Sequence, residues 1–117
     1  MRLTEVDYSD AKPVEGYGPG FFRIGGEVHE GPIVVTAWSV TPWGGYEDTA
    51  ALTDLAGAAD VVFVGTGAQI AHIPASLRVA CEEAGVGVEI MSSPAACRTY
   101  NVLVSEGRRV ALALLPV

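Results

Sequence analysis

Residues 94–101 carry the densest set of side chains that could take part in chemistry. Cys97 is a nucleophile when its thiol ionises, and a helix that begins at this segment would favour the thiolate through its dipole, as would the neighbouring Arg98. Tyr100 and Asn101 follow on the same helix. The competing interpretation is that Cys97 packs as a small apolar residue beside Tyr100. Both a reactive and a buried thiol therefore remain open.

A second motif is Gly65-Thr66-Gly67, which follows an apolar strand as many nucleotide-binding turns do. A dinucleotide fingerprint needs a third glycine three residues on, and Ile70 occupies that place. The chain also lacks a phosphate-binding loop, because its single lysine is Lys12. Two interpretations remain. Either both glycines supply positive φ where the strand ends, or their N–H groups bind a small anion or metabolite.

These two motifs are expected to lie together. The strands that precede them should be parallel neighbours, and the carboxyl ends of parallel strands open at one sheet edge, where α/β proteins usually bind ligands. The predicted ligand cleft between the turn and the helix start at Pro94 comprises Gly65, Thr66, Gly67, His72, Cys97, Arg98, Tyr100 and Asn101.

For two residues of this predicted cleft, two interpretations remain. His72 could act as an acid or base at neutral pH, or be an inert loop residue. Asn101 could bind a ligand or a loop backbone. The sequence contains neither a Gly-x-Ser-x-Gly elbow nor a clustered carboxylate pair. We therefore favour a protein without catalytic activity and keep a ligand-binding protein or enzyme as the alternative.

The elements that position these residues follow from apolar spacing and from Gly and Pro breakers. Residues 2–20 are rich in Gly, Pro and acidic residues and are predicted to form a loop. One helix is expected after Asp48, one at Pro74, and one at Pro94 behind the caps Ser92 and Ser93. Strands are predicted at 21–24, 27–30, 32–40, 61–64, 86–91 and 110–115.

This order alternates strands with helices. Such spacing predicts an α/β fold, a three-layer sandwich with right-handed crossovers, preceded by a small antiparallel β layer. No linker divides the chain, so residues 1–117 are expected to form a single compact domain.

Composition limits the partners. The formal net charge is −7, which opposes nucleic-acid binding, and the pair Arg108-Arg109 is interpreted as a solvated strand start. No apolar run is long enough to span a bilayer and no signal sequence is visible, so we expect a soluble, cytoplasmic protein. The two cysteines and two histidines lack metal-ligand spacing. Neither a metal nor another cofactor is predicted.

Two tryptophans flank the segment 39–42. One of them is expected in the core. Trp43, in a Pro-Trp-Gly-Gly turn, is the candidate for the exposed one and therefore for an anchor in a protein interface.

Several motifs together resemble one family of small proteins without an assigned activity, which includes the mitochondrial complex I (NADH:ubiquinone oxidoreductase) assembly factor 3 and an adipogenesis-associated relative. The resemblance covers nearly the whole chain, and its most specific part is Thr99-Tyr-Asn101. The motifs are Gly18-Pro-Gly-Phe-Phe-Arg-Ile24, Trp38-Ser-Val-Thr-Pro-Trp43, Val64-Gly-Thr-Gly67, Ala84-Gly-Val-Gly-Val-Glu89 and Ala95-Ala-Cys-Arg-Thr-Tyr-Asn101.

The resemblance implies a mixed, mostly parallel central sheet whose last strand is antiparallel to its neighbours. It also implies a non-catalytic role in assembling respiratory complex I or another membrane complex, with assembly factors or respiratory subunits as partners. Peripheral membrane association and a homo-oligomer are compatible with that role. The family supplies no catalytic residues to carry over.

Overall fold

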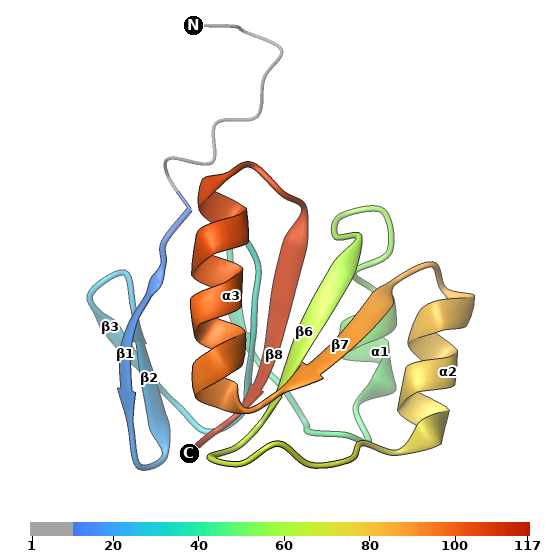
Figure 1. Ribbon diagram of the computed structural model, residues 1–117, viewed down its shortest axis with the longest axis horizontal. Helices are drawn as coiled ribbons and strands as arrows, with labels where there is room; N and C mark the ends of the chain where they lie inside the picture. The colour runs from blue at the N-terminus through green and yellow to red at the C-terminus, as the bar shows by residue number, and fades with distance from the viewer. Residues whose placement is uncertain (1–10) are drawn as a thin grey trace, which may run out of the picture.

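The computed structural model describes residues 11–117 (Figure 1). Within this range the chain forms a mixed α/β fold with three helices, a three-stranded sheet and a five-stranded sheet. The smaller sheet and the long C-terminal helix lie towards one side of the molecule, and the two shorter helices lie towards the other (Figure 1).

The three-stranded sheet opens the fold as an antiparallel meander of β1 (Val14–Gly18), β2 (Phe21–Ile24) and β3 (Glu27–Glu30). The predicted hairpin of β2 and β3 is confirmed, and Gly25 and Gly26 supply its positive φ angles of 59° and 81°. The predicted loop is wrong over β1. Gly18 can enter a strand because the absent side chain leaves room for the ring of Phe21, whose Cε1 would lie 2.5 Å from an added Cβ. Residues 2–10 of that loop lie outside the described range.

The predicted strand over 32–40 is wrong as a single element, because it forms a hairpin of β4 (Ile33–Val35) and β5 (Val40–Pro42). The polar side chains between them stabilise the turn. Thr36 Oγ1 accepts hydrogen bonds from the backbone N–H groups of Trp38 and Ser39, at 3.3 and 3.1 Å. Such local bonds compete with a continuous ladder.

The five-stranded sheet has the order β5-β4-β8-β6-β7, where β6 is Val61–Thr66, β7 is Gly87–Met91 and β8 is Val110–Leu115. β6 runs parallel to β7 and to β8, whereas β4 runs antiparallel to β8 and to β5. The expectation that the last strand opposes its neighbours is therefore wrong for β6 and right for β4. The sheet is mixed, but its pairs divide evenly between the two directions.

Each helix begins close to its predicted start. α1 (Thr49–Thr53) is N-capped by Asp48, α2 (Ala75–Glu83) follows Pro74, and α3 (Ser93–Ser105) is N-capped by Ser92. The caps explain these positions, since side-chain oxygens accept from first-turn N–H groups in α1 and α3.

Alternate side chains of β6 point into two separate apolar clusters, one on each face of the five-stranded sheet. Phe63 packs with Tyr100 of α3 and with Phe22 of the three-stranded sheet. Val62 joins the cluster that contains Leu52 of α1 and Leu77 of α2. The sheet is thus covered on both faces.

Candidate functional site

Ser93 joins the turn after β6 to the start of α3. Its backbone N–H donates to the Gly67 carbonyl at 2.7 Å, and the Gly67 N–H donates to Ser93 Oγ at 2.9 Å. The Ser93 hydroxyl donates in turn to the Leu115 carbonyl at 2.6 Å. These bonds confirm that the two predicted turns are neighbours. We call this contact of residues 65–67, 92–95 and 115 the Ser93 junction.

The two glycines of the turn have different roles. Gly67 has a φ of 103°, as predicted for a residue at a strand exit. Gly65 does not have positive φ, so its predicted role is wrong. A Cβ at Gly65 would lie 2.7 Å from Ser93 Oγ and 2.8 Å from Ser93 Cα. Gly65 is required because α3 begins directly against the β6 backbone.

Thr66 is also engaged within the junction. Its hydroxyl lies 2.8 Å from the Gln69 carbonyl and 3.2 Å from the Met91 carbonyl, and it accepts the Ala71 N–H at 3.0 Å. Thr66 and Gly67 therefore bond to groups outside the predicted cleft, and these bonds hold the chain path after β6.

Cys97 and Tyr100 are buried in the cluster between α3 and the sheet. Burial raises the pKa of the Cys97 thiol to about 12, and the opposing effect of Arg98 is smaller. Burial likewise raises the pKa of Tyr100 to about 12, and its hydroxyl has no hydrogen-bond partner among residues 11–117. With its pKa raised in this way, the Cys97 thiol stays protonated at neutral pH.

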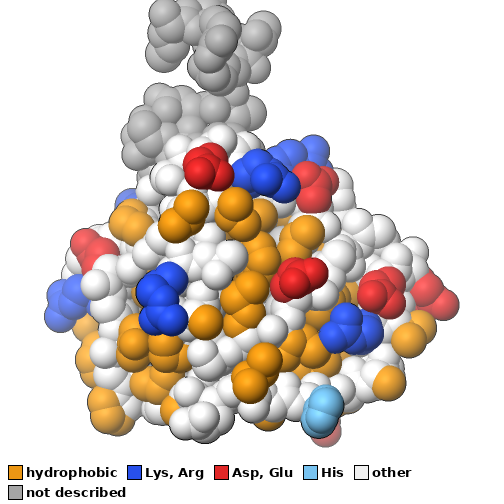
Figure 2. Space-filling model, in the orientation of Figure 1, with side chains coloured by type: hydrophobic (Ala, Val, Ile, Leu, Met, Phe, Trp, Pro, Cys, Tyr) orange, Lys and Arg blue, Asp and Glu red, His pale blue; other side chains and the backbone are white. Residues whose placement is uncertain are grey.

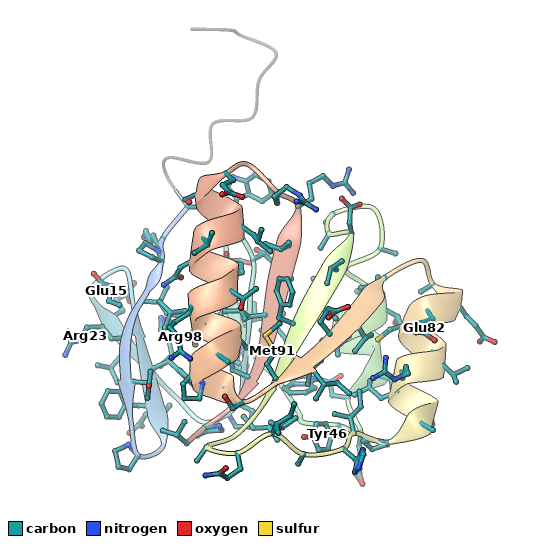
Figure 3. All side chains as sticks on the ribbon, in the orientation of Figure 1. Glu15, Arg23, Tyr46, Glu82, Met91 and Arg98 are labelled. Carbon is teal, nitrogen blue, oxygen red and sulfur yellow. The ribbon has the colours of Figure 1, made fainter. Side chains whose placement is uncertain are left out.

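The remaining predicted residues point elsewhere. Asn101 accepts the Val14 N–H at 2.9 Å and donates to the Val14 carbonyl at 3.0 Å, so it binds α3 to β1. Arg98 is exposed on α3 (Figure 3). His72 is exposed and lines a shallow hollow of about 280 Å³ with Ile70 and Ile90. These side chains do not converge on one pocket with the turn.

A second shallow hollow of about 380 Å³ does lie beside the Ser93 junction. The eight residues of the predicted cleft do not line it. Ligand binding here stays a prediction. The lining residues are Ala68, Gln69, Ile70, Ile90, Met91, Ser92 and Ala95.

Ile70 lies between these two hollows with 66% of its surface exposed. β7 beside it is the last strand in the sheet order. Hydrophobic side chains gather over the middle of this face of the molecule (Figure 2). We call Ile70, Ala71, Ile90 and Met91 the Ile70 surface.

The two tryptophans have the opposite exposure to the one expected from the sequence. Trp43 is 3% exposed, its Nε1 donates to the Asp48 carbonyl at 3.2 Å, and its ring meets Tyr46 edge to face. The interface role predicted for Trp43 is therefore wrong. Trp38 is 65% exposed because the β4–β5 hairpin places it at the tip of a turn.

Trp38 borders a hollow of about 460 Å³ between the three-stranded sheet and the β4–β5 turn. Sequence reasoning missed this site, because it placed residues 36–39 inside a strand. The signal available was the run of polar residues Thr36 and Ser39 within an apolar segment. We call it the Trp38 hollow, and it is lined by Lys12, Ile24, Glu27, His29 and residues 36–40.

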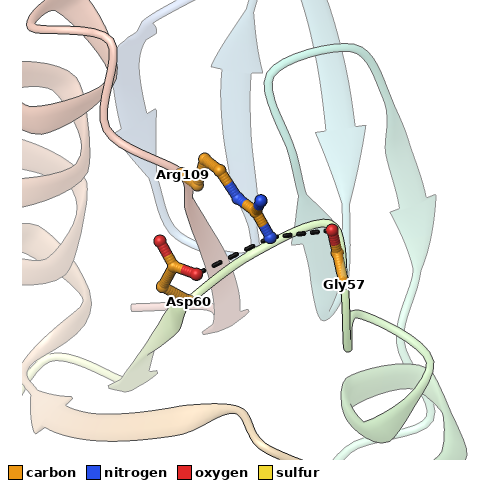
Figure 4. A network of polar contacts seen from close by, with 3 residues as sticks. All are labelled: Gly57, Asp60 and Arg109. Atoms are coloured by element: carbon orange, nitrogen blue, oxygen red, sulfur yellow. Dashed lines mark hydrogen bonds and ion pairs between the residues drawn. The ribbon is translucent and has the colours of Figure 1, made fainter.

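On the other side of the same turn lies Arg109. Its Nη2 donates to the Gly57 carbonyl at 2.7 Å and lies 3.6 Å from Asp60 Oδ1 (Figure 4). Both charged side chains are exposed, so this ion pair adds little stability. The network ties the loop before β6 to the start of β8.

A family model described as a protein of unknown function (DUF498/DUF598) matches residues 14–115. The chain belongs to this family. An uncharacterised protein from Rhodobacter capsulatus is 52% identical over 117 residues, and the match covers 100% of this chain and 94% of the relative.

A second relative is the NADH dehydrogenase (ubiquinone) 1 alpha subcomplex assembly factor 3 of Homo sapiens, 29% identical over 126 residues. That match covers 99% of this chain and 67% of the assembly factor. A crystal structure titled as an outer membrane protein of Bartonella henselae has a TM-score of 0.80 and 32% identity. It covers 89% of this chain and 93% of that chain. The resemblance seen in the motifs is thus confirmed.

Proposed function

We propose that this DUF498 protein acts without catalysis, through contacts with other proteins, in the assembly of respiratory complex I or another membrane complex. The observation that carries the proposal is the match of 99% of the chain to an assembly factor of NADH dehydrogenase. The chain spans about two thirds of that factor's length, so the shared part is the folded domain described above.

The chemistry of the predicted cleft supports a role without catalysis. Its nucleophile candidate, Cys97, is buried and its pKa is raised to about 12. The Thr66 hydroxyl bonds to the Gln69 and Met91 carbonyls, and the Gly67 N–H donates to Ser93 Oγ. A group that already has an internal partner gains little from a substrate.

The contact surface that we propose is the Ile70 surface. Ile70 is one of the most exposed large apolar side chains of the described range, and it lies beside an edge strand. Exposed apolar side chains next to an unpaired strand edge are a common site of protein association, because a partner can bury the side chains and pair with the strand.

The test is a gene deletion in the cell that encodes the protein, followed by complementation. We expect the deletion to lower the amount of assembled complex I, measured on native gels against a subunit of another respiratory complex. The wild-type chain should restore it, and Ile70→Glu should not, because a carboxylate in the buried contact lacks a partner.

Val28→Glu is the matched control. Val28 is a 50% exposed apolar residue on β3 of the three-stranded sheet, and it lines neither hollow beside Ile70. It should restore assembly like the wild type. Unchanged complex I in the deletion strain, or full restoration by Ile70→Glu, would contradict the proposal.

Membrane association is part of the same proposal. The described residues contain no helix long and apolar enough to cross a bilayer, while the Bartonella relative carries the name of an outer membrane protein. We therefore propose a peripheral association, checked by sedimentation with lipid vesicles. The cytoplasmic location and the homo-oligomer stay predictions. Fractionation of the cell and light scattering of the purified protein test them.

A further inference from the structure

Three residues with ionisable side chains line the Trp38 hollow. They are Lys12, Glu27 and His29. None of these three side chains forms a hydrogen bond or ion pair with another described residue. Charged groups without internal partners remain available to a ligand.

The position of Lys12 is set by packing. Its aliphatic stem lies over Gly25 so closely that an added Cβ there would collide with Lys12 Cδ. Gly25 has a φ of 59° in the β2–β3 turn, so glycine serves both the turn and this contact. The stem is thereby held against the hairpin and the ammonium borders the hollow.

The hydroxyl pair at the turn adds a donor. Thr36 Oγ1 accepts from two backbone N–H groups and lies 2.8 Å from Ser39 Oγ. Because both lone pairs of Thr36 Oγ1 are occupied, its own proton goes to Ser39 Oγ. The Ser39 hydroxyl proton is then free to donate into the hollow that Ser39 lines.

The rest of the lining is apolar. Ile24 and Ala37 are buried beneath the hollow and Val40 is half-buried beside it. The Trp38 side chain stands at the border with 65% of its surface exposed.

From this arrangement we propose that the Trp38 hollow binds a small zwitterionic amino acid with an apolar or aromatic side chain. The ligand carboxylate meets Lys12 and the Ser39 hydroxyl, and the ligand ammonium meets Glu27. The ligand side chain lies against the apolar lining of Ile24, Ala37 and Val40. A hollow of about 460 Å³ suits a ligand of this size. The site is distinct from the Ile70 surface and does not depend on the assembly role.

The experiment uses three related probes: L-phenylalanine, phenylacetate, which lacks the ammonium, and phenethylamine, which lacks the carboxylate. Each is titrated into the ¹⁵N-labelled protein, and amide shifts are followed. We expect L-phenylalanine to shift the amides of residues 36–40. Each probe that lacks one charged group should bind at least about tenfold more weakly.

Two variants test which side chain contacts each charged group of the ligand. Lys12→Gln should weaken L-phenylalanine at least about tenfold, and Glu27→Gln should do the same without weakening phenylacetate. Glu30→Gln is the matched control, because Glu30 is exposed on the same strand as Glu27 and does not line the hollow. It should leave every affinity unchanged.

Three results would overturn the proposal. The first is no shift at residues 36–40 with any probe at about 10 mM, which corresponds to binding too weak to be specific. The second is phenylacetate binding as tightly as L-phenylalanine. The third is an equal effect of Glu27→Gln and Glu30→Gln.

Discussion

The two ends of the five-stranded sheet use their polar residues in opposite ways. At the Ser93 junction, where β6, β7 and β8 end, Ser93 and Thr66 bond to backbone groups of the same junction. At the Trp38 hollow, beside the other end of β8, Lys12 and Glu27 have no partner among the described residues.

We infer from this difference that the Ser93 junction contributes to stability and that the Trp38 hollow serves binding. The carboxyl end of parallel strands is where α/β proteins usually bind ligands. Here a buried serine and a glycine without room for a side chain fill the space between the β6 turn and the start of α3. Lys12 and Glu27 lie at the opposite end, beside the Trp38 hollow. Changes at the junction should therefore alter the free energy of unfolding, and changes at the hollow should alter affinity.

Gly65→Ala is expected to have the largest effect. The new methyl group would lie within 2.8 Å of the Ser93 backbone, so β6 and α3 must separate. We expect the free energy of unfolding to fall by about 3 kcal/mol, as in overpacked cores. Urea denaturation measures it. Gly16→Ala is the control, because an added Cβ at Gly16 has no atom within 4 Å. Equal stability of the two variants would contradict the closed junction.

Ser93→Ala removes the hydroxyl and leaves the Gly67 N–H and the Leu115 carbonyl without it. Unsatisfied buried groups of this kind should cost about 2 kcal/mol of unfolding free energy in total. Ser105→Ala is the control, since the Ser105 hydroxyl is exposed and donates only within its own helix. A loss at Ser93 no larger than at Ser105 would show that these bonds add nothing.

Alkaline pH should destabilise the α3 side of the fold. Burial raises the pKa of Cys97 from 9.0, and that of Tyr100 from 10.0, to about 12. Above pH 9 the unfolded chain therefore binds fewer protons than the folded chain. The free energy of unfolding falls as pH rises towards 12, by at most about 1.4 kcal/mol per pH unit for each group.

Below about pH 8 these two groups make almost no pH-dependent contribution. Urea denaturation at several pH values measures the slope. Cys97→Ser should flatten it most between about pH 8 and 9, where the unfolded Cys97 ionises and the unfolded Tyr100 is still mostly protonated. A slope that Cys97→Ser leaves unchanged would place the titration on other groups.

Asn101→Ala should detach β1 from α3, because Asn101 makes both hydrogen bonds to Val14. We expect a loss of about 1 kcal/mol in unfolding free energy and faster hydrogen exchange of the Val14 amide. Asn101→Asp keeps the acceptor for the Val14 N–H and should lose less protection. Unchanged exchange in both variants would contradict this role.

Lys12→Gln and Glu27→Gln are expected to have the smallest effect on stability. Their charged groups have no partner among residues 11–117, so the free energy of unfolding should change by less than about 0.5 kcal/mol. A larger loss of unfolding free energy, measured by urea denaturation, would show that these two residues stabilise the fold. The proposed difference between the two ends of the sheet would then be wrong.

Much of the fold could be predicted from local pattern. The strand Val110–Leu115 agrees to the residue, and Ser92 marks the start of α3, because apolar runs and caps are properties of neighbouring residues. The proximity of the two turns also follows from local pattern, since parallel neighbours end at one edge.

The misses depend on contacts between distant residues. The direction of β8 relative to β6 depends on its insertion between β4 and β6, which the strand pattern does not record. The burial of Trp43 depends on two contacts. Its Nε1 donates to the Asp48 carbonyl, and its ring packs edge to face against Tyr46. The Trp38 hollow depends on the packing of β2 and β3 near the β4–β5 turn, so side chains up to 28 positions apart line one site.

The most direct test of the contrast is a single ¹H–¹⁵N titration of the protein with L-phenylalanine. We expect shifts at the amides of residues 36–40 of the Trp38 hollow and none at Gly67 and Ala95 of the Ser93 junction. Shifts at Gly67 and Ala95 without shifts at residues 36–40 would contradict it.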